Sequence, residues 1–456
     1  MSSLPPPGPS RAPETPEKDG KKDYDFERLR AKLAATPTVR ATGRVLGVTG
    51  LALRFTLPGV RVGDVVEVRR RGAPLPCEVV GFAEGEVIAM PLGALTGVGP
   101  DDEVEATGLV SGVRAHPSLL GRVVDGLGRP LDGGDAIPGD EWIPVDRDPP
   151  PALERRRVHV PIPTGVRVLD GLLTLGEGQR MGLFAGSGVG KSALLGAVAR
   201  GAAADVVVVG LVGERGREVG EFLDHALGDE GRARSVVVVA TSDVSALERL
   251  RSAQVATAYA EYFRDQGARV MLLVDSITRF ARAQREVGLA AGEPPARRGY
   301  PPSVFAMLPR LLERAGQAAR GSITAIYTIL VEGGDMDEPI ADEARGILDG
   351  HVVLDRTIAA RGHYPAVDVT GSLSRVMDSI VTPEHRDAAR RLRAMVAVHE
   401  AKRDLVTLGA YAKGTDRELD EALLHMPRIE QFLKQDPREK TPFEDTLTRL
   451  RRAVLG

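Results

Sequence analysis

The chain has 456 residues, which exceeds what one hydrophobic core usually organises and indicates two or three domains. Its composition is ordinary for a globular protein, and a formal net charge of -3 does not indicate a nucleic-acid carrier. The longest apolar runs, such as residues 206–212 and 236–240, fall far short of the roughly 18 residues needed to span a bilayer. We therefore expect no transmembrane helix, no signal peptide and a cytoplasmic location.

The first 37 residues divide into two segments of different character. Residues 1–22 are rich in Pro, Ser, Glu and Lys and lack apolar periodicity, which predicts a disordered tail. Residues 23–37 place Phe26, Leu29 and Leu33 on one helical face before Thr36-Pro37, which predicts a short amphipathic helix. Such a helix either packs on its own domain or docks a partner.

Residues 38–107 contain short Val-rich stretches separated by glycines, such as D-V-V-E-V and E-V-I-A-M. Their regular turn signals predict a small β-barrel domain. Barrels of this size can bind oligonucleotides, but here the expected strands lack aromatic residues interleaved with basic ones. The only basic cluster, Arg69 to Arg71, is interpreted as a charged turn. Cys77, the only cysteine, has no disulfide partner and is expected to be a small buried side chain in a reducing compartment.

Residues 108–382 alternate β-branched runs with helical segments, which predicts a mostly parallel sheet covered on both faces. The predicted strand cores are residues 181–184, 206–212, 236–240, 270–274, 323–330 and 352–354. Residues 383–456 show helical spacing with no strand between the helices, so a small helical C-terminal domain is expected. The predicted fold class is α/β: an N-terminal small β-barrel, a central sheet domain and a C-terminal helical domain.

A glycine-rich turn follows the first of these strands in the sequence M-G-L-F-A-G-S-G-V-G-K-S, residues 181–192. Glycines in such a turn let backbone N–H groups point at phosphate oxygens at a helix N-terminus, which predicts a nucleoside triphosphate site in a P-loop (RecA-like) domain. Lys191 would neutralise the β and γ phosphates, and the Ser192 hydroxyl would ligate Mg²⁺. The consensus asks for Gly where this chain has Ala185, the smallest side chain that could replace it. The predicted nucleotide-binding residues of the loop are Gly186, Ser187, Gly188, Val189, Gly190, Lys191, Ser192 and Ala193.

Two carboxylates follow predicted strands and complete the expected chemistry. Asp275 directly follows the apolar run 270–274, in the position expected to order the Mg²⁺ shell. It could instead, or in addition, cap the following helix. Glu214, just after residues 206–212, is the candidate for aligning the attacking water; the alternative is a surface ion pair with Arg215 or Arg217. Since parallel strands end at one sheet edge, we expect both carboxylates beside the phosphate loop.

The order of several motifs resembles the ATPases of flagellar and virulence type III protein export, relatives of the catalytic subunit of rotary ATP synthases. The matching motifs are A-G-S-G-V-G-K-S, V-G-E-R-G-R-E-V, D-S-I-T-R-F-A-R-A-Q-R-E, G-E-P-P-A-R-R-G-Y-P-P-S-V-F-A, G-S-I-T-A-I-Y-T and H-Y-P-A-V-D-V. The similarity extends from about residue 40 to about residue 433. The C-terminal D-L-V-T-L-G-A-Y-A-K-G-T-D is closer to flagellar members, while other segments also suit the secretion group, so the subfamily stays open.

The resemblance implies roles that spacing alone does not assign. It makes Glu214 the catalytic carboxylate, Arg215 its neighbour near the phosphates and Glu218 a second acidic residue of that loop. It implies that Arg279 reaches the nucleotide from the same subunit and that adenine stacks on Tyr364. Arg375 would be an arginine finger that reaches the γ phosphate of the adjacent subunit, which implies a homohexamer.

One position departs from the family pattern. This chain reads V-L-D-R at residues 353–356, where many members read V-L-S-R. The added negative charge of Asp355 could perturb a subunit contact, although solvent would screen most of it at an exposed site.

The resemblance implies Mg²⁺-dependent ATP hydrolysis that energises protein export by a type III secretion or flagellar apparatus. The implied partners are a stator-like regulator at the N-terminus, a central stalk protein, an export gate and chaperone–substrate complexes, at the periphery of the inner membrane and without nucleic acid. Two alternatives are a Rho-like hexameric RNA translocase, which should carry exposed RNA-binding aromatics, and a non-catalytic nucleotide-binding ring subunit, which should lack a carboxylate at position 214.

Overall fold

The computed structural model describes residue 30, residues 41–139 and residues 141–455. The chain divides into two units, residues 1–40 and residues 41–456. The tail and the amphipathic helix predicted for residues 1–37 lie outside the described residues, apart from Arg30, which is helical. Within the described ranges, no helix combines the length and the apolar character that crossing a membrane requires.

The second unit begins with a closed six-stranded barrel, in the spatial order β1-β2-β5-β4-β3-β6. Its apolar interior includes Phe55, Val66 and Cys77, so the expected burial of the cysteine is confirmed. The sixth strand was not among the predicted stretches because its sequence, EVEATGLV, is diluted by Glu and Gly; it closes the barrel by pairing with both β1 and β3. The strands are β1 (Thr42–Thr49), β2 (Ala52–Thr56), β3 (Asp64–Arg69), β4 (Leu75–Ala83), β5 (Glu86–Pro91) and β6 (Glu103–Val110).

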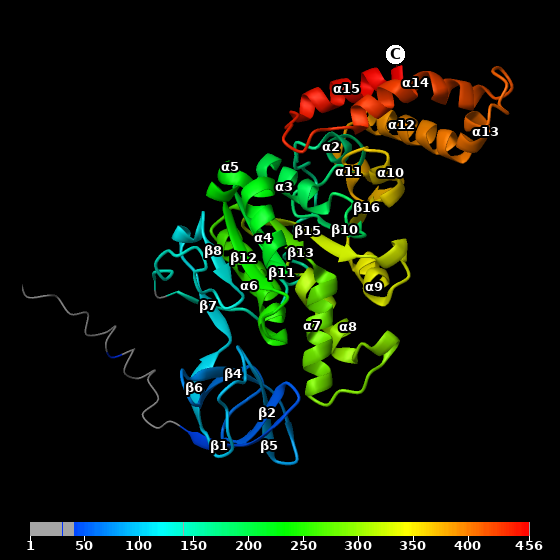
Figure 1. Cartoon of the computed structure of the whole chain (residues 1–456). Helices are drawn as coiled ribbons and strands as arrows, with labels where there is room; N and C mark the ends of the chain where they lie inside the picture. Colours follow the sequence, from blue (N-terminus) through cyan, green and yellow to red (C-terminus); the bar gives the residue numbers. More distant parts are fainter. Residues whose placement is uncertain (1–29, 31–40, 140, 456) are drawn as a thin grey trace, which may run out of the picture. The chain divides into compact units, whose positions relative to one another are not determined.

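A nine-stranded sheet forms the centre of the unit, with the main order β17-β16-β10-β15-β13-β11-β12-β8 (Figure 1). All six predicted strand cores lie within observed strands. Two strands on the edges were not predicted: the three-residue β8 and β17, which pairs antiparallel with β16. The strands are β8 (Val123–Asp125), β10 (Arg180–Ala185), β11 (Val206–Glu214), β12 (Ser235–Thr241), β13 (Arg269–Asp275), β14 (Gly316–Gln317), β15 (Ser322–Leu330), β16 (Gly350–Leu354) and β17 (Val367–Ser374); β14 pairs with β15, and β7 (Gly112–Arg114) pairs with β9 (Trp142–Pro144) in a separate ribbon.

Both faces of the central sheet are buried, as predicted. Along β13, Leu272 belongs to one apolar cluster, whereas Met271 and Leu273 belong to another on the opposite face. The first cluster includes residues of α6 and α7, and the second includes residues of α3. The helices around the sheet are α2 (Arg167–Leu172), α3 (Lys191–Gly201), α4 (Gly216–Glu221), α5 (Gly228–Ala233), α6 (Ala246–Asp265), α7 (Ile277–Ala290), α8 (Pro302–Leu312), α9 (Pro339–Ile347), α10 (Arg356–Ala360) and α11 (Met377–Ile380).

The C-terminal part is helical, as predicted, and forms the orange and red end of the chain in Figure 1. Its helices are α12 (Pro383–Ala401), α13 (Arg403–Thr407), α14 (Arg417–Leu433) and α15 (Phe443–Leu455). Buried residues of α12, α14 and α15, such as Leu392, Ile429 and Leu450, join the apolar cluster that also contains α2 and α3. The barrel, sheet domain and helical domain confirm the predicted fold class, while the exact domain limits at residues 107 and 382 stay predictions.

Candidate nucleotide site

The phosphate loop connects the end of β10 to the first residue of α3. Gly188 and Gly190 adopt left-handed backbone conformations, with φ of 77° and 87°, which favour glycine because a Cβ strains that geometry. Ala185 is the last residue of β10, lies fully buried, and has no such backbone conformation. The departure from the consensus therefore requires no conformation that alanine disfavours.

A cavity of about 450 Å³ opens over this loop. Most of the predicted loop residues line it, together with Glu214, Arg215 and Arg279 from neighbouring elements. Val189 is different because its side chain is buried in the apolar core. The predicted loop residues at the cavity wall are Gly186, Ser187, Gly188, Gly190, Lys191, Ser192 and Ala193.

Lys191 brings the two predicted carboxylates together. Its Nζ lies 2.6 Å from Oδ1 of Asp275 and 3.4 Å from Oε1 of Glu214. These acids end β13 and β11, which are adjacent parallel strands, so both emerge at the same sheet edge. Thr328 on β15 also donates to Asp275 Oδ1, at 2.7 Å. The three strands thus hold an ammonium group between two buried carboxylates beside the phosphate loop.

Glu214 is buried among charged side chains, and the pKa of its carboxyl is raised to about 7. Burial is the main cause, followed by the negative charge of Asp275 and a hydrogen bond with Glu218. The same hydrogen bond lowers the pKa of Glu218. The cations Lys191 and Arg279 act in the opposite direction on Glu214, and Arg279 Nη1 lies 2.9 Å from its Oε2.

The structural alternatives for both acids are wrong. Arg215 pairs with Glu218 and Arg217 with Glu221, so Glu214 is not part of a surface ion pair with either arginine. The N-cap of α7 is Ser276, whose hydroxyl accepts from Arg279 N at 3.3 Å, and not Asp275. The two carboxylates are therefore directed at the lysine of the phosphate loop.

A second cavity lies beside Tyr364 and shares Gly190 and Ala193 with the phosphate cavity. A Cβ built on Gly190 would lie 3.2 Å from Cδ1 of Tyr364, so the tyrosine ring lies directly over the last glycine of the loop. Leu194 and Ala197 of α3 supply apolar surface on the same wall. The arrangement offers an aromatic ring and apolar surface next to the phosphate cavity, around a hollow of only about 40 Å³.

Arg375 lies outside both cavities. It is exposed just after β17, and its Nη2 donates to the backbone carbonyl of Arg345 at 3.2 Å. The residues that line the phosphate cavity do not include it. The chain thus gathers Lys191, Glu214 and Asp275 beside the phosphate loop, whereas Arg375, which the resemblance assigns to an adjacent subunit, lies apart from them.

Sequence reasoning missed Arg356, the first residue of α10, which lines the phosphate cavity. A Cβ on Gly186 would lie 3.5 Å from its Nη2. The available signal was a basic residue just after the β16 strand, at the sheet edge that carries the other site residues. Its neighbour Asp355 caps α10 by accepting from Thr357 N at 2.7 Å and Ile358 N at 2.9 Å, so its charge has a local role.

The oxygen donors here fit a divalent cation that is carried by a nucleotide. Among the described residues, no group of three or more His, Cys, Asp or Glu side chains forms a metal cage. Ser192 contributes an exposed hydroxyl at the cavity wall, and Glu214 and Asp275 contribute carboxylates behind Lys191. Such a donor set suits Mg²⁺, which usually binds few protein oxygens and takes its other ligands from phosphates and water.

Comparisons with known proteins identify the family. Residues 165–374 match the nucleotide-binding domain of the ATP synthase alpha/beta family, and residues 381–452 match the C-terminal domain of the type III secretion ATPase EscN. The chain is 52% identical over 421 residues to a type 3 secretion system ATPase of Xanthomonas euvesicatoria, covering 92% of this chain and 95% of the relative. It is 49% identical over 418 residues to a flagellum-specific ATP synthase of Bacillus subtilis, covering 91% and 95%.

Solved structures agree with these relatives. The assembled ATPase EscN from the type III secretion system of enteropathogenic E. coli superposes with a TM-score of 0.86 at 44% identity, covering 90% of this chain and 100% of that one. EscN in complex with its central stalk EscO gives a TM-score of 0.84 at the same identity and coverage. The chain belongs to the family of type III secretion and flagellar export ATPases.

Proposed function

We propose that this ATPase hydrolyses ATP with Mg²⁺ in the phosphate cavity and thereby energises protein export by a type III secretion or flagellar apparatus. The observation that carries the proposal is the position of Lys191, at the N-terminus of α3 and between two buried carboxylates from adjacent strands. A lysine so placed can exchange carboxylate partners for phosphate oxygens without moving far. Bound Mg²⁺ would neutralise phosphate charge, held by Ser192 directly and by Asp275 through its hydration shell.

Glu214 supplies the group that aligns the attacking water. Its carboxyl lies in the cavity wall, and its raised pKa makes it a better proton acceptor than an exposed glutamate. Arg279 holds the carboxylate in place from α7. The backbone N–H groups of the loop, together with Arg215 and Arg356 at the cavity wall, favour a polyanion there.

The Tyr364 cavity takes the adenine base. The ring is 41% exposed and lies over Gly190, so one of its faces can stack on a base whose phosphates extend along the loop. Stacking tolerates any purine, and hydrogen-bonding groups around the ring would have to supply any preference among bases.

Arg375 completes the site of an adjacent subunit, which requires a ring. Its exposure after β17 and its absence from this chain's own phosphate cavity support a heterologous contact, in which one copy lends a guanidinium to the next. A homohexamer has such an interface between every pair of neighbours. A guanidinium lent in this way can accelerate phosphoryl transfer by about 10³ to 10⁵.

The proposed partners follow from the family. The structure of EscN with its central stalk EscO supports a central stalk partner for this chain. A stator-like regulator at residues 1–36, an export gate, chaperone–substrate complexes and a peripheral position at the inner membrane are further proposals. Removing residues 1–36 should abolish binding of the regulator in a pull-down while sparing hydrolysis, and retained binding would refute that role.

The alternatives have less support. The comparisons give no support to a Rho-like RNA translocase, and single-stranded RNA should leave turnover unchanged. A non-catalytic ring subunit would not need a buried carboxylate of raised pKa beside the phosphate-loop lysine.

The direct test is Glu214→Gln, with Glu221→Gln as the matched control. Glu221 is an exposed glutamate on the same segment that pairs with Arg217. We expect Glu214→Gln to lower kcat by about 10²- to 10⁴-fold, because a neutral amide cannot accept a proton. Binding of ADP should stay within about threefold of wild type. Unchanged turnover in Glu214→Gln would remove Glu214 from the mechanism.

A further inference from the structure

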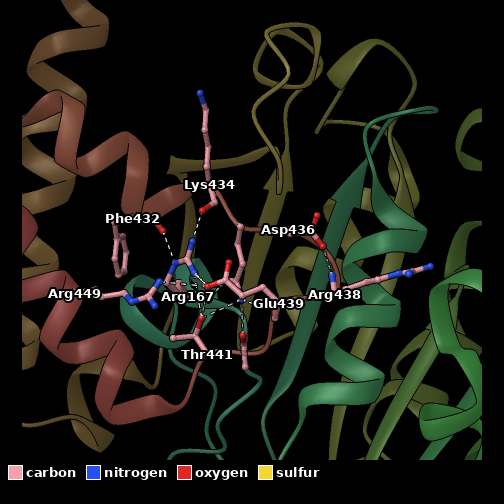
Figure 2. A network of polar contacts seen from close by, with 10 residues as sticks. Arg167, Phe432, Lys434, Asp436, Arg438, Glu439, Thr441 and Arg449 are labelled. Carbon is pink, nitrogen blue, oxygen red and sulfur yellow. Dashed lines mark hydrogen bonds and ion pairs between the residues drawn. The ribbon is translucent and has the colours of Figure 1, made fainter.

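A buried arginine at the start of α2 binds the end of a helix from the C-terminal domain (Figure 2). Arg167 is 3% exposed. Its Nε donates to the carbonyl of Phe432 at 3.0 Å, and its Nη2 donates to the carbonyl of Lys434. These carbonyls lie at the C-terminus of α14, where backbone oxygens lack partners within the helix and a positive charge is favoured.

The same guanidinium also binds the segment that leads from α14 to α15. Nη1 pairs with the carboxylate of Glu439 and donates to Thr441 Oγ1 at 3.2 Å. On the other side of the segment, Arg200 near the end of α3 donates to the carbonyl of Pro437 at 2.5 Å. Residues 434–441 are therefore hydrogen-bonded to α2 at both ends and to α3 in the middle.

This segment forms one wall of the Tyr364 cavity. Gln435, Asp436, Pro437 and Glu439 line that cavity together with residues of α3. Gln435 is 7% exposed; its backbone N donates to the carbonyl of Tyr364 at 2.9 Å, and its side-chain oxygen accepts from Arg167 N at 2.7 Å. Gln435 therefore connects the backbone at position 167 to the residue that carries the proposed stacking ring, while the guanidinium holds the carbonyls of Phe432 and Lys434, which precede Gln435 in the chain.

We infer that Arg167 is a positioning residue that fixes the 434–441 wall of the base cavity and so couples nucleotide-base binding to the C-terminal helices. The inference rests on the proposed function, because it needs a base in the Tyr364 cavity. Removing the guanidinium takes the side-chain donors away from the carbonyls of Phe432 and Lys434. It also leaves the Glu439 carboxylate with only Thr441 and Arg449 as partners, which weakens the attachment of the wall but leaves the phosphate loop intact. Coupling of this kind is reciprocal, so a bound base also orders the segment that joins α14 to α15.

The test compares two probes on the full chain, ADP and inorganic tripolyphosphate. In Arg167→Gln we expect Kd for ADP to rise about tenfold or more, while Kd for tripolyphosphate, which occupies only the phosphate cavity, stays within about twofold. The matched control is Arg452→Gln, an exposed arginine on α15, which should leave both values unchanged. Hydrogen exchange in residues 434–441 should slow when ADP binds to wild type and much less in Arg167→Gln.

Equal losses for the two probes, or no loss for ADP, would overturn the inference. If Arg167→Gln does not fold, Arg167→Lys is the milder variant of the same position, because its single ammonium keeps the positive charge but cannot reach all four acceptors at once, and it should weaken ADP binding selectively. A selective loss supports the inference, and an unchanged Kd for ADP overturns it. If wild type neither binds ADP nor turns over ATP, the proposed function itself fails; if wild type does both and the variants bind ADP equally well, only the role of Arg167 fails.

Discussion

The phosphate cavity and the end of β17 each carry a positively charged side chain, but in different surroundings. In the cavity, Lys191 is 14% exposed and lies between two carboxylates. After β17, Arg375 is exposed and makes its hydrogen bond to a backbone carbonyl. A paired, buried cation is already in position for a ligand that binds to its own chain, whereas an exposed guanidinium can extend to a neighbouring molecule. Under the proposed function, this difference means that one chain binds nucleotide and that two are needed to hydrolyse it.

The largest expected effect follows from removing the exposed arginine, Arg375. Arg375→Ala should lower kcat by about 10³-fold or more, because charge in the transition state loses its external cation. Binding of ADP to the variant should stay close to wild type, as measured by calorimetry. The control is Arg390→Ala, an exposed arginine of α12 that pairs with Asp378. A kcat for Arg375→Ala near that of the control would show that the exposed arginine has no part in catalysis.

The next prediction concerns the buried carboxylate of the phosphate cavity, Glu214, and the pH dependence of turnover. Because the pKa of Glu214 is raised to about 7, the carboxylate that aligns water is progressively protonated as pH falls below that value. We expect kcat/KM to fall below pH 7, approaching a tenfold loss per pH unit. The residual kcat/KM of Glu214→Gln should not show this fall below pH 7. Any fall that remains in the variant measures the contribution from protonation of ATP itself. The same fall in both proteins would contradict the assignment.

The raised pKa also has a consequence for stability. The folded state binds the Glu214 proton more tightly than the unfolded state does, so the free energy of unfolding falls as pH rises from the ordinary glutamate range to about 7. Urea unfolding between pH 5 and pH 8, with wild type and Glu214→Gln side by side, should show a weaker decline in the variant.

A smaller effect concerns the base cavity next to the phosphates. Tyr364→Ala should raise KM for ATP about tenfold, since loss of base stacking usually costs about 1–3 kcal/mol. Tyr364→Phe keeps the aromatic face and should stay near wild type. An equal rise of KM in both variants would mean that the hydroxyl and not the ring face matters.

The smallest effect tests whether Asp355 acts locally and not at a subunit contact. Asp355→Ala removes the cap of α10 and should lower the free energy of unfolding by about 1 kcal/mol. Asp355→Ser keeps a side-chain oxygen that can still cap the helix and should retain most of that stability. A Ser variant that is as destabilised as the Ala variant in urea would contradict the capping role.

Local patterns were sufficient to predict the centre of the molecule. Apolar runs marked the strands of the central sheet, and because parallel strands end together, Glu214 and Asp275 could be placed beside Lys191. Two strands were harder to predict. The edge strand β8 has only three residues, which join a sheet formed by later parts of the chain, and the barrel strand β6 alternates weakly.

Long-range contacts explain the other omissions. Ser276 rather than Asp275 caps α7, a choice between adjacent residues that only the backbone decides. Arg167 reaches partners that lie more than 260 positions later in the chain, and no local pattern marks them. Arg356 had a signal in its position after β16, but its direction toward Gly186 depends on how α10 is placed.

The most direct test of the central claim mixes two inactive variants, Lys191→Ala and Arg375→Ala, under conditions in which mixed rings are shown to form. If one chain binds the triphosphate and its neighbour supplies the guanidinium, about a quarter of the interfaces in randomly mixed rings combine an intact lysine with an intact arginine. Turnover should then reappear at roughly that fraction of wild type. Mixed rings without any turnover would contradict a site shared between chains.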